Sequence, residues 1–125
     1  MDRSIPILIP AGLFVLTLAF GVWLGRAGKP YGGALLNVHK LAALAAVVVT
    51  AVLTYQVLRG SPGPTNAIAL LVFAGVCFLA LFATGALLSA TSIDRTILSV
   101  VHGILTVLAL IAAGIAFYLL LGRNP

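Results

Sequence analysis

The chain has almost no acidic residues, because it contains no glutamate and only two aspartates, Asp2 and Asp94, in 125 residues. Both aspartates lie beside the ends of apolar segments, so neither is expected deep inside a membrane. Proton-coupled small multidrug transporters depend on a carboxylate buried within the membrane. The sequence therefore excludes that class of transporter.

Cysteine and other reactive groups are equally scarce. The single Cys77 excludes an intramolecular disulfide and a Cys-x-x-Cys motif. The sequence also contains no nucleophile–base pair and no phosphate-binding loop. Whether the protein is an enzyme stays open, and any enzymatic activity would have to come from a bound cofactor.

Charge of either sign is rare, since 7% of the residues are charged and 62% are hydrophobic. In a soluble domain, about a quarter of the residues are charged. The apolar residues form four runs, each close to the roughly 20 residues that a helix needs to cross a bilayer. These runs are Ile5–Leu24, Leu35–Leu58, Asn66–Ala90 and Arg95–Leu121. The sequence thus predicts an all-α, single membrane domain of four transmembrane helices in an up-down bundle surrounded by lipid.

The net charge of +5 does not indicate a nucleic-acid partner. The seven cations are scattered over the predicted helix ends, as interfacial anchors are, and they form no basic patch. Glycine and proline are concentrated in the two loops 27–33 and 61–64, where they break the helices. Ser4 and Asp94 are expected to cap the first and fourth helices.

The two halves of the chain resemble each other when the sequence is shifted by 63 residues, the separation of His39 and His102. Identical pairs include Ile5 and Ile68, Gly12 and Gly75, Leu35 and Leu98, Val38 and Val101, Ala46 and Ala109, and Tyr55 and Tyr118. This repeat predicts two tandem helical hairpins related by a pseudo-two-fold axis along the membrane normal. The alternative is that all-apolar helices align with each other through composition alone.

His39 and His102 are the only histidines, and each lies a few residues inside an apolar run. A rise of about 1.5 Å per residue puts both about 10 Å from the membrane midplane, on the same side. Ionisable residues inside a membrane are costly and usually functional. We expect His39 and His102 to be the axial ligands of one b-type haem per chain, bound in the helical core.

Small residues at the level of the histidines would leave room for a porphyrin. The candidates are Gly21, Ala43, Ala46 and Gly85, although close helix packing also uses small residues. The Nδ1–H group of each histidine is expected to be held by the carbonyl of Leu35 or Leu98, or by a nearby hydroxyl. The candidate hydroxyls are those of Ser99 and Thr106.

Four cations near the same interface are candidate partners of the haem propionates, together with Tyr31 and the N–H groups of Gly32 and Gly33. The cations are Arg26, Lys29, Lys40 and Arg95. The alternative for each of them is an ordinary interfacial anchor. A zinc or copper ion is a less suitable occupant. Zinc takes about four ligands, and only interfacial Asp94 adds a further ligand at this level.

Two parallel helices that each give a histidine to a b-type haem resemble the cytochrome b561 type and small haem b anchor subunits. The stretch Leu36-Asn37-Val38-His39-Lys40-Leu41 is also similar to one found in small four-helix bacterial membrane proteins. The resemblance implies a protein of the bacterial cytoplasmic membrane that carries single electrons. Its partner would be a quinol, a small oxidant such as superoxide, or another redox protein. The chain departs from the two-haem b561 pattern, which needs four histidines, so only one bis-histidine site is possible.

Two other functions stay open at this point. The protein could be a haem-free membrane assembly or interaction subunit, in which the histidines make interhelical hydrogen bonds. It could also be a haem carrier or sensor, in which haem binds and leaves. Each of the three functions is compatible with a homo-oligomer.

Overall fold

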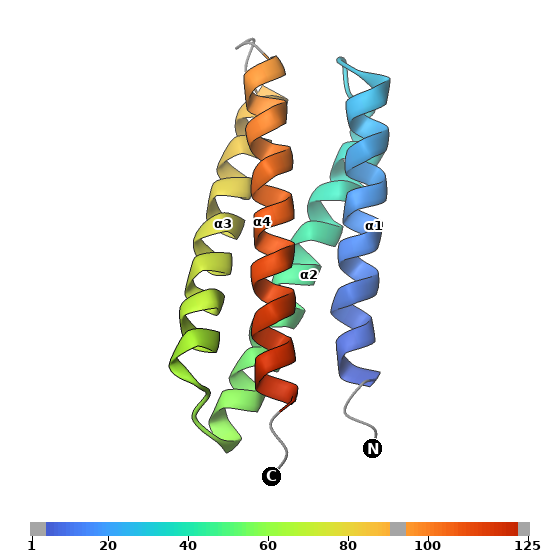
Figure 1. Ribbon diagram of the computed structural model, residues 1–125. Coiled ribbons are helices and arrows are strands. Elements are labelled where there is room, and N and C mark those ends of the chain that lie inside the picture. The colour runs from blue at the N-terminus through green and yellow to red at the C-terminus, as the bar shows by residue number, and fades with distance from the viewer. Residues whose placement is uncertain (1–4, 91–94, 123–125) are drawn as a thin grey trace. The chain divides into compact units, whose positions relative to one another are not determined.

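Four long helices make up the protein, and the computed structural model describes residues 5–90 and 95–122 (Figure 1). They are α1 (Ile5–Ala27), α2 (Gly33–Gly60), α3 (Thr65–Ala90) and α4 (Arg95–Leu121). Every regular element in these two ranges is an α-helix, which confirms the predicted all-α class. The predicted helix ends differ from the observed ones by three residues or fewer. The expected caps Ser4 and Asp94 lie outside the described residues.

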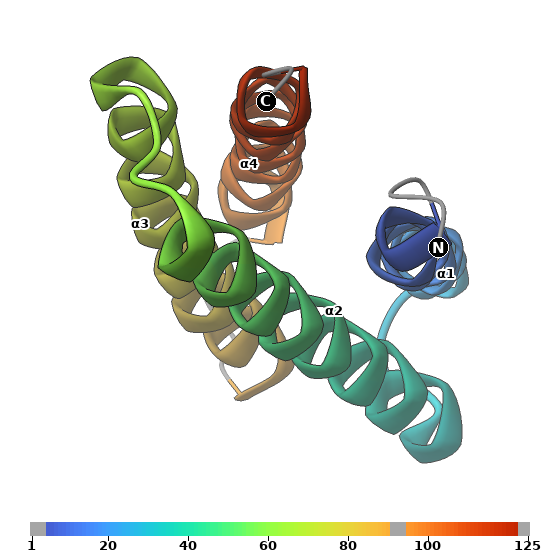
Figure 2. The same cartoon turned by 90° about the horizontal axis from the view of Figure 1, so that it is seen from below.

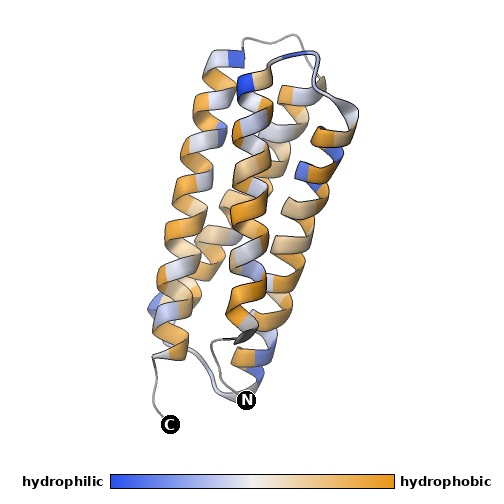
Figure 3. Ribbon diagram, turned by 90° about the vertical axis from the view of Figure 1, so that its right-hand side faces the viewer, coloured by the Kyte–Doolittle hydropathy of each residue, from blue (hydrophilic) through white to orange (hydrophobic). Residues whose placement is uncertain are grey.

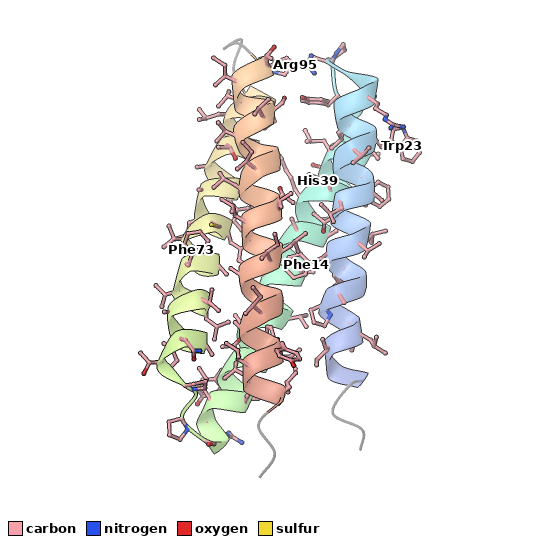
Figure 4. All side chains as sticks on the ribbon, viewed as in Figure 1. Phe14, Trp23, His39, Phe73 and Arg95 are labelled. Atoms are coloured by element: carbon pink, nitrogen blue, oxygen red, sulfur yellow. The ribbon has the colours of Figure 1, made fainter. Side chains whose placement is uncertain are left out.

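All four helices are long and apolar enough to cross a membrane. Figure 3 shows hydrophobic residues along the helices and hydrophilic residues concentrated toward their ends. Large apolar side chains are exposed along their length, and Trp23 points outward from α1, with its ring stacked on Phe20 (Figure 4). Exposed apolar surface of this extent requires lipid around it, so the chain is an integral membrane protein.

The chain divides after Gly60 into two compact units, and each unit is a helical hairpin. In the first hairpin α1 packs against α2, and in the second α3 packs against α4. Figure 2 shows that α2 is inclined to α1. Each hairpin is described by itself, and both the single domain and the pseudo-two-fold axis between the hairpins stay predictions.

Glycine ends α1 at the point where the breaker-rich loop begins. Gly28 adopts a positive φ of 71°, and its N–H group donates to the carbonyl of Leu24 over 3.1 Å. This is the left-handed C-cap that glycine adopts at no steric cost. In the following loop, the ammonium group of Lys29 lies 5.9 Å from the centroid of the Tyr31 ring.

Small side chains form the interface of the second hairpin. Ala74 of α3 packs with Ala112 and Ala113 of α4, and Leu70 and Phe78 flank this cluster. Lipid tails are as apolar as leucine, so helices in a membrane associate through close contact between small residues. The packed face of α2 also consists of small residues, since its buried residues are Ala42, Ala46 and Thr50.

We expect Ala74→Leu to lower the free energy of unfolding by about 1–3 kcal/mol, because overpacking a filled interface costs this much. Ala74 is only 2% exposed. The matched control is Ala69→Leu, which makes the same change at an exposed position of the same helix. Denaturant unfolding in detergent micelles measures both. Equal losses in the two variants would show that Ala74 does not lie in a packed interface.

Candidate functional site

His39 lies half-buried on α2 and is bonded to the neighbouring helix (Figure 4). Its Nδ1 atom is 3.0 Å from the backbone carbonyl oxygen of Thr17 on α1. A carbonyl oxygen can only accept a hydrogen bond, so Nδ1 must carry the proton. The neutral ring has one proton, which leaves the lone pair on Nε2. His39 is therefore held in the tautomer that can bind a metal through Nε2.

Gly21 allows the His39 ring to come this close to α1. A Cβ atom at Gly21 would lie 3.0 Å from Cε1 of His39 and 3.5 Å from its Nδ1. Two other glycines of the same helix, Gly12 and Gly25, have no such neighbour within 4 Å. Gly21 is thus the glycine of α1 whose missing side chain makes room for the ring.

His102 has the same kind of environment in the second hairpin. The ring is half-buried on α4, and its Nδ1 atom lies 2.7 Å from the Oγ1 atom of Thr84 on α3. A Cβ atom at Gly85 would lie 3.4 Å from Cε1 of His102, which is an ordinary contact distance. Each histidine therefore bonds through Nδ1 to the preceding helix of its own hairpin, beside a glycine.

The 63-residue repeat places these contacts at matching levels. Gly21 of the first hairpin corresponds to Thr84 of the second, and Val22 corresponds to Gly85. Both rings thus reach the same level of the helix that precedes them. The hydrogen-bond acceptors differ, since a backbone carbonyl holds His39 and a side-chain hydroxyl holds His102.

The expected Nδ1 partners were wrong. Across the helix interface, Nδ1 of His39 lies against the Thr17 carbonyl and Nδ1 of His102 lies against the Thr84 hydroxyl, rather than against the carbonyls of Leu35 and Leu98. Each ring extends away from the axis of its own helix, so it reaches the neighbouring helix rather than the carbonyl one turn back.

The two hydroxyls of α4 do not hold His102 either. The Thr106 hydroxyl donates to the backbone carbonyl of His102 over 2.8 Å, rather than to its ring. Ser99 is exposed. The residues that sequence reasoning missed are thus the Thr17 carbonyl and Thr84. The only signal for Thr84 was its place beside Gly85, at the repeat position of Gly21.

The structure places the remaining site candidates on helices and in the loop between α1 and α2. Ala46 is fully buried on α2 and Ala43 is half-buried one turn from His39. Lys40 directly follows His39 and is exposed, whereas Lys29 lies in the loop before α2. Arg95 is the first residue of α4 (Figure 4). Their contacts with a haem stay predictions.

The described residues offer no cluster of three or more His, Cys, Asp or Glu side chains that could hold a metal ion. A zinc site of about four protein ligands therefore has no basis within residues 5–90 and 95–122. A haem iron differs in this respect, because the porphyrin supplies four nitrogens and the protein supplies only the axial ligands.

Comparison of the chain with protein-family models, with characterised proteins and with solved structures finds no match.

We expect Gly21→Ala to disturb His39, because the new methyl group would lie 3.0 Å from Cε1 and the ring must move by a few tenths of an ångström. Where no neighbour interferes, alanine stabilises a helix by about 1 kcal/mol relative to glycine. The control is Gly12→Ala, where no neighbour lies within 4 Å.

Unfolding in micelles and the ring ¹H–¹⁵N spectrum of His39 measure the effect. Gly12→Ala should keep the ring spectrum of the parent and raise its stability by up to about 1 kcal/mol. Gly21→Ala should be less stable than Gly12→Ala and should shift the His39 ring signals. If the two variants behave alike, the close approach of His39 to α1 is wrong.

Proposed function

We propose that the protein is a membrane haem b protein that carries single electrons, with His39 and His102 as the two axial ligands of one iron. The observation that carries the proposal is the hydrogen bond from Nδ1 of His39 to the Thr17 carbonyl. This bond leaves the Nε2 lone pair for a metal.

The hydrogen bond matches a general feature of metal-binding histidines. Such histidines almost always donate the other ring N–H to a carbonyl, a carboxylate or a water, which fixes the ring and raises its basicity. His39 makes this second interaction with the Thr17 carbonyl, and Gly21 leaves the space that the ring needs to reach it. The chain thus provides an orientation that a flexible surface histidine would lack.

The histidines, the cations and the apolar helices would each have a separate role in binding the haem. Nε2 of His39 and Nε2 of His102 would hold the iron, each ring being fixed through its Nδ1 atom. Lys29, Lys40 and Arg95 would neutralise the propionates. The apolar helices would exclude water from the haem. This exclusion would lower the local dielectric constant around the haem and influence its reduction potential.

Bound haem would supply reversible one-electron chemistry, with the iron alternating between the ferrous and ferric states. The donor and acceptor would be a quinol, a small oxidant such as superoxide, or a redox protein. The bacterial cytoplasmic membrane is the proposed location, because a membrane electron carrier of this kind meets quinols there.

A second candidate function is favoured by the same hydrogen bonds. Each one joins the two helices of a hairpin, so the histidines could serve packing alone in a haem-free assembly or interaction subunit. A hydrogen bond between membrane helices contributes about 0.6 kcal/mol on average. Packing needs only the Nδ1 donor, whereas haem ligation needs Nδ1 and Nε2 together, and this difference separates the two functions.

We expect the purified protein to be red, with the visible spectrum of a six-coordinate b haem and one haem per chain. The informative variants are His39→Asn and His102→Asn. The asparagine side chain can donate a hydrogen bond from nearly the position of Nδ1, but it has no group in place of Nε2. Each variant should keep the hairpin stability and convert the haem to a five-coordinate form that binds carbon monoxide. The double variant should hold no haem.

The control is Asn37→Ala, which removes an exposed polar side chain from the same helix and should leave the spectrum unchanged. A preparation that is colourless and stays colourless after haem is added would remove the proposed function. Asparagine variants that keep stability in such a preparation would instead support the packing function.

A further inference from the structure

The hydroxyl group of Thr84 lies close to three polar atoms. The Oγ1 atom lies 2.7 Å from Nδ1 of His102, 2.9 Å from the carbonyl oxygen of Ala80 and 3.1 Å from that of Leu81. The hydroxyl has one proton to share among these three atoms. Which of them receives it decides the protonation of the histidine ring.

The two carbonyl contacts decide to which atoms the Thr84 hydroxyl donates its proton. If the Thr84 proton pointed at His102, oxygen atoms would face each other at 2.9 Å and 3.1 Å with no hydrogen between them. Such pairs of lone pairs repel, whereas a hydroxyl proton between them forms two normal hydrogen bonds. The hydroxyl therefore donates to Ala80 and Leu81, and it accepts from the Nδ1–H group of His102.

We infer that Thr84 is a positioning residue, which holds His102 in the tautomer with a proton on Nδ1 and the lone pair on Nε2. The inference rests on the proposed function, since the role of this tautomer is to present Nε2 to an iron. Which ring nitrogen of a histidine binds a metal is set by the hydrogen bond that the other nitrogen makes. At His102 that bond is to the Thr84 side chain.

Two other described groups beside His102 have different roles. The Thr106 hydroxyl is directed at the backbone carbonyl of His102 over 2.8 Å. A Cβ atom added at Gly85 would lie 3.4 Å from Cε1 of His102, an ordinary contact distance, so this position does not choose the tautomer.

The first hairpin offers a control within the same molecule. His39 is held by the backbone carbonyl of Thr17, which no change at position 84 removes.

The hydrogen bonds of Thr84 also form a chain, from His102 Nδ1–H to the hydroxyl and on to the Ala80 carbonyl. Hydrogen bonds in series polarise one another. This polarisation pushes electron density toward Nε2, which makes His102 a stronger donor to ferric iron. Loss of the Thr84 hydroxyl should therefore raise the midpoint potential of the bound haem.

The first test uses the full chain in detergent micelles, without haem and with ¹⁵N-labelled histidine. Two-bond ¹H–¹⁵N correlations report which ring nitrogen is protonated. The parent should show the Nδ1–H form at both histidines. Thr84→Val should move His102 to the Nε2–H form or to a mixture, while His39 keeps its parent signals. Thr84→Ser, which keeps the hydroxyl, should restore the parent pattern.

The unchanged His39 signals serve as the check that Thr84→Val folds, and Thr84→Ala is the second variant if it does not. A valine or alanine variant that folds and keeps His102 in the Nδ1–H form, with the parent population, overturns the inference.

The second test adds haem to the same proteins. Thr84→Val should weaken haem binding by about 10–100-fold, the usual effect of removing the partner of a ligating histidine. It should also raise the midpoint potential, and Thr84→Ser should restore both values. A parent that binds haem, with a valine variant equal to it in affinity and potential, contradicts the inference and leaves the proposed function standing. A parent that never binds haem, but whose His102 tautomer responds to Thr84→Val, removes the proposed function and retains the positioning role of Thr84.

Discussion

The structure of each hairpin depends on one requirement: an imidazole inside an apolar membrane must find an acceptor for its Nδ1–H group. No water is present in the bilayer core to accept it. His39 meets this need with the Thr17 carbonyl, and His102 meets it with the Thr84 hydroxyl. Each acceptor belongs to the preceding helix, so the two helices must approach closely at that level. In the first hairpin Gly21 provides the space for this approach.

This requirement also chooses the register of the helices. Alanines recur along the packed faces, as Ala42 and Ala46 do on α2, so similar small residues meet if one helix slides past another by a turn. Apolar packing alone therefore discriminates weakly between registers in a membrane. A displacement of one turn, about 5.4 Å, would carry His39 away from the space at Gly21 and His102 away from the Thr84 hydroxyl. The histidines thus specify an arrangement that the alanines only permit.

The sequence was sufficient for the helices because long apolar runs have one stable conformation in lipid, and their boundaries follow glycine and proline. It also singled out the histidines, since nothing else in the apolar runs can do comparable chemistry. The partners of Nδ1 could not be predicted in the same way. A backbone carbonyl such as that of Thr17 has no sequence signature, because every residue carries one. Thr84 replaces a glycine of the other half, so the repeat itself concealed its role.

The hydrogen-bond acceptors of His39 and His102 differ in how far substitution can alter them. Because His39 is held by a backbone group, a change of side chain at position 17 leaves its acceptor in place. Because His102 is held by a side chain, its acceptor can be removed or weakened without moving the helix. The two hairpins carry their histidines at matching repeat positions, but the acceptor of one ring is fixed and the acceptor of the other can be changed by substitution. Since the partner of a histidine sets its strength as a ligand, a haem held by both rings would be tuned mainly through His102, by the choice of residue at position 84.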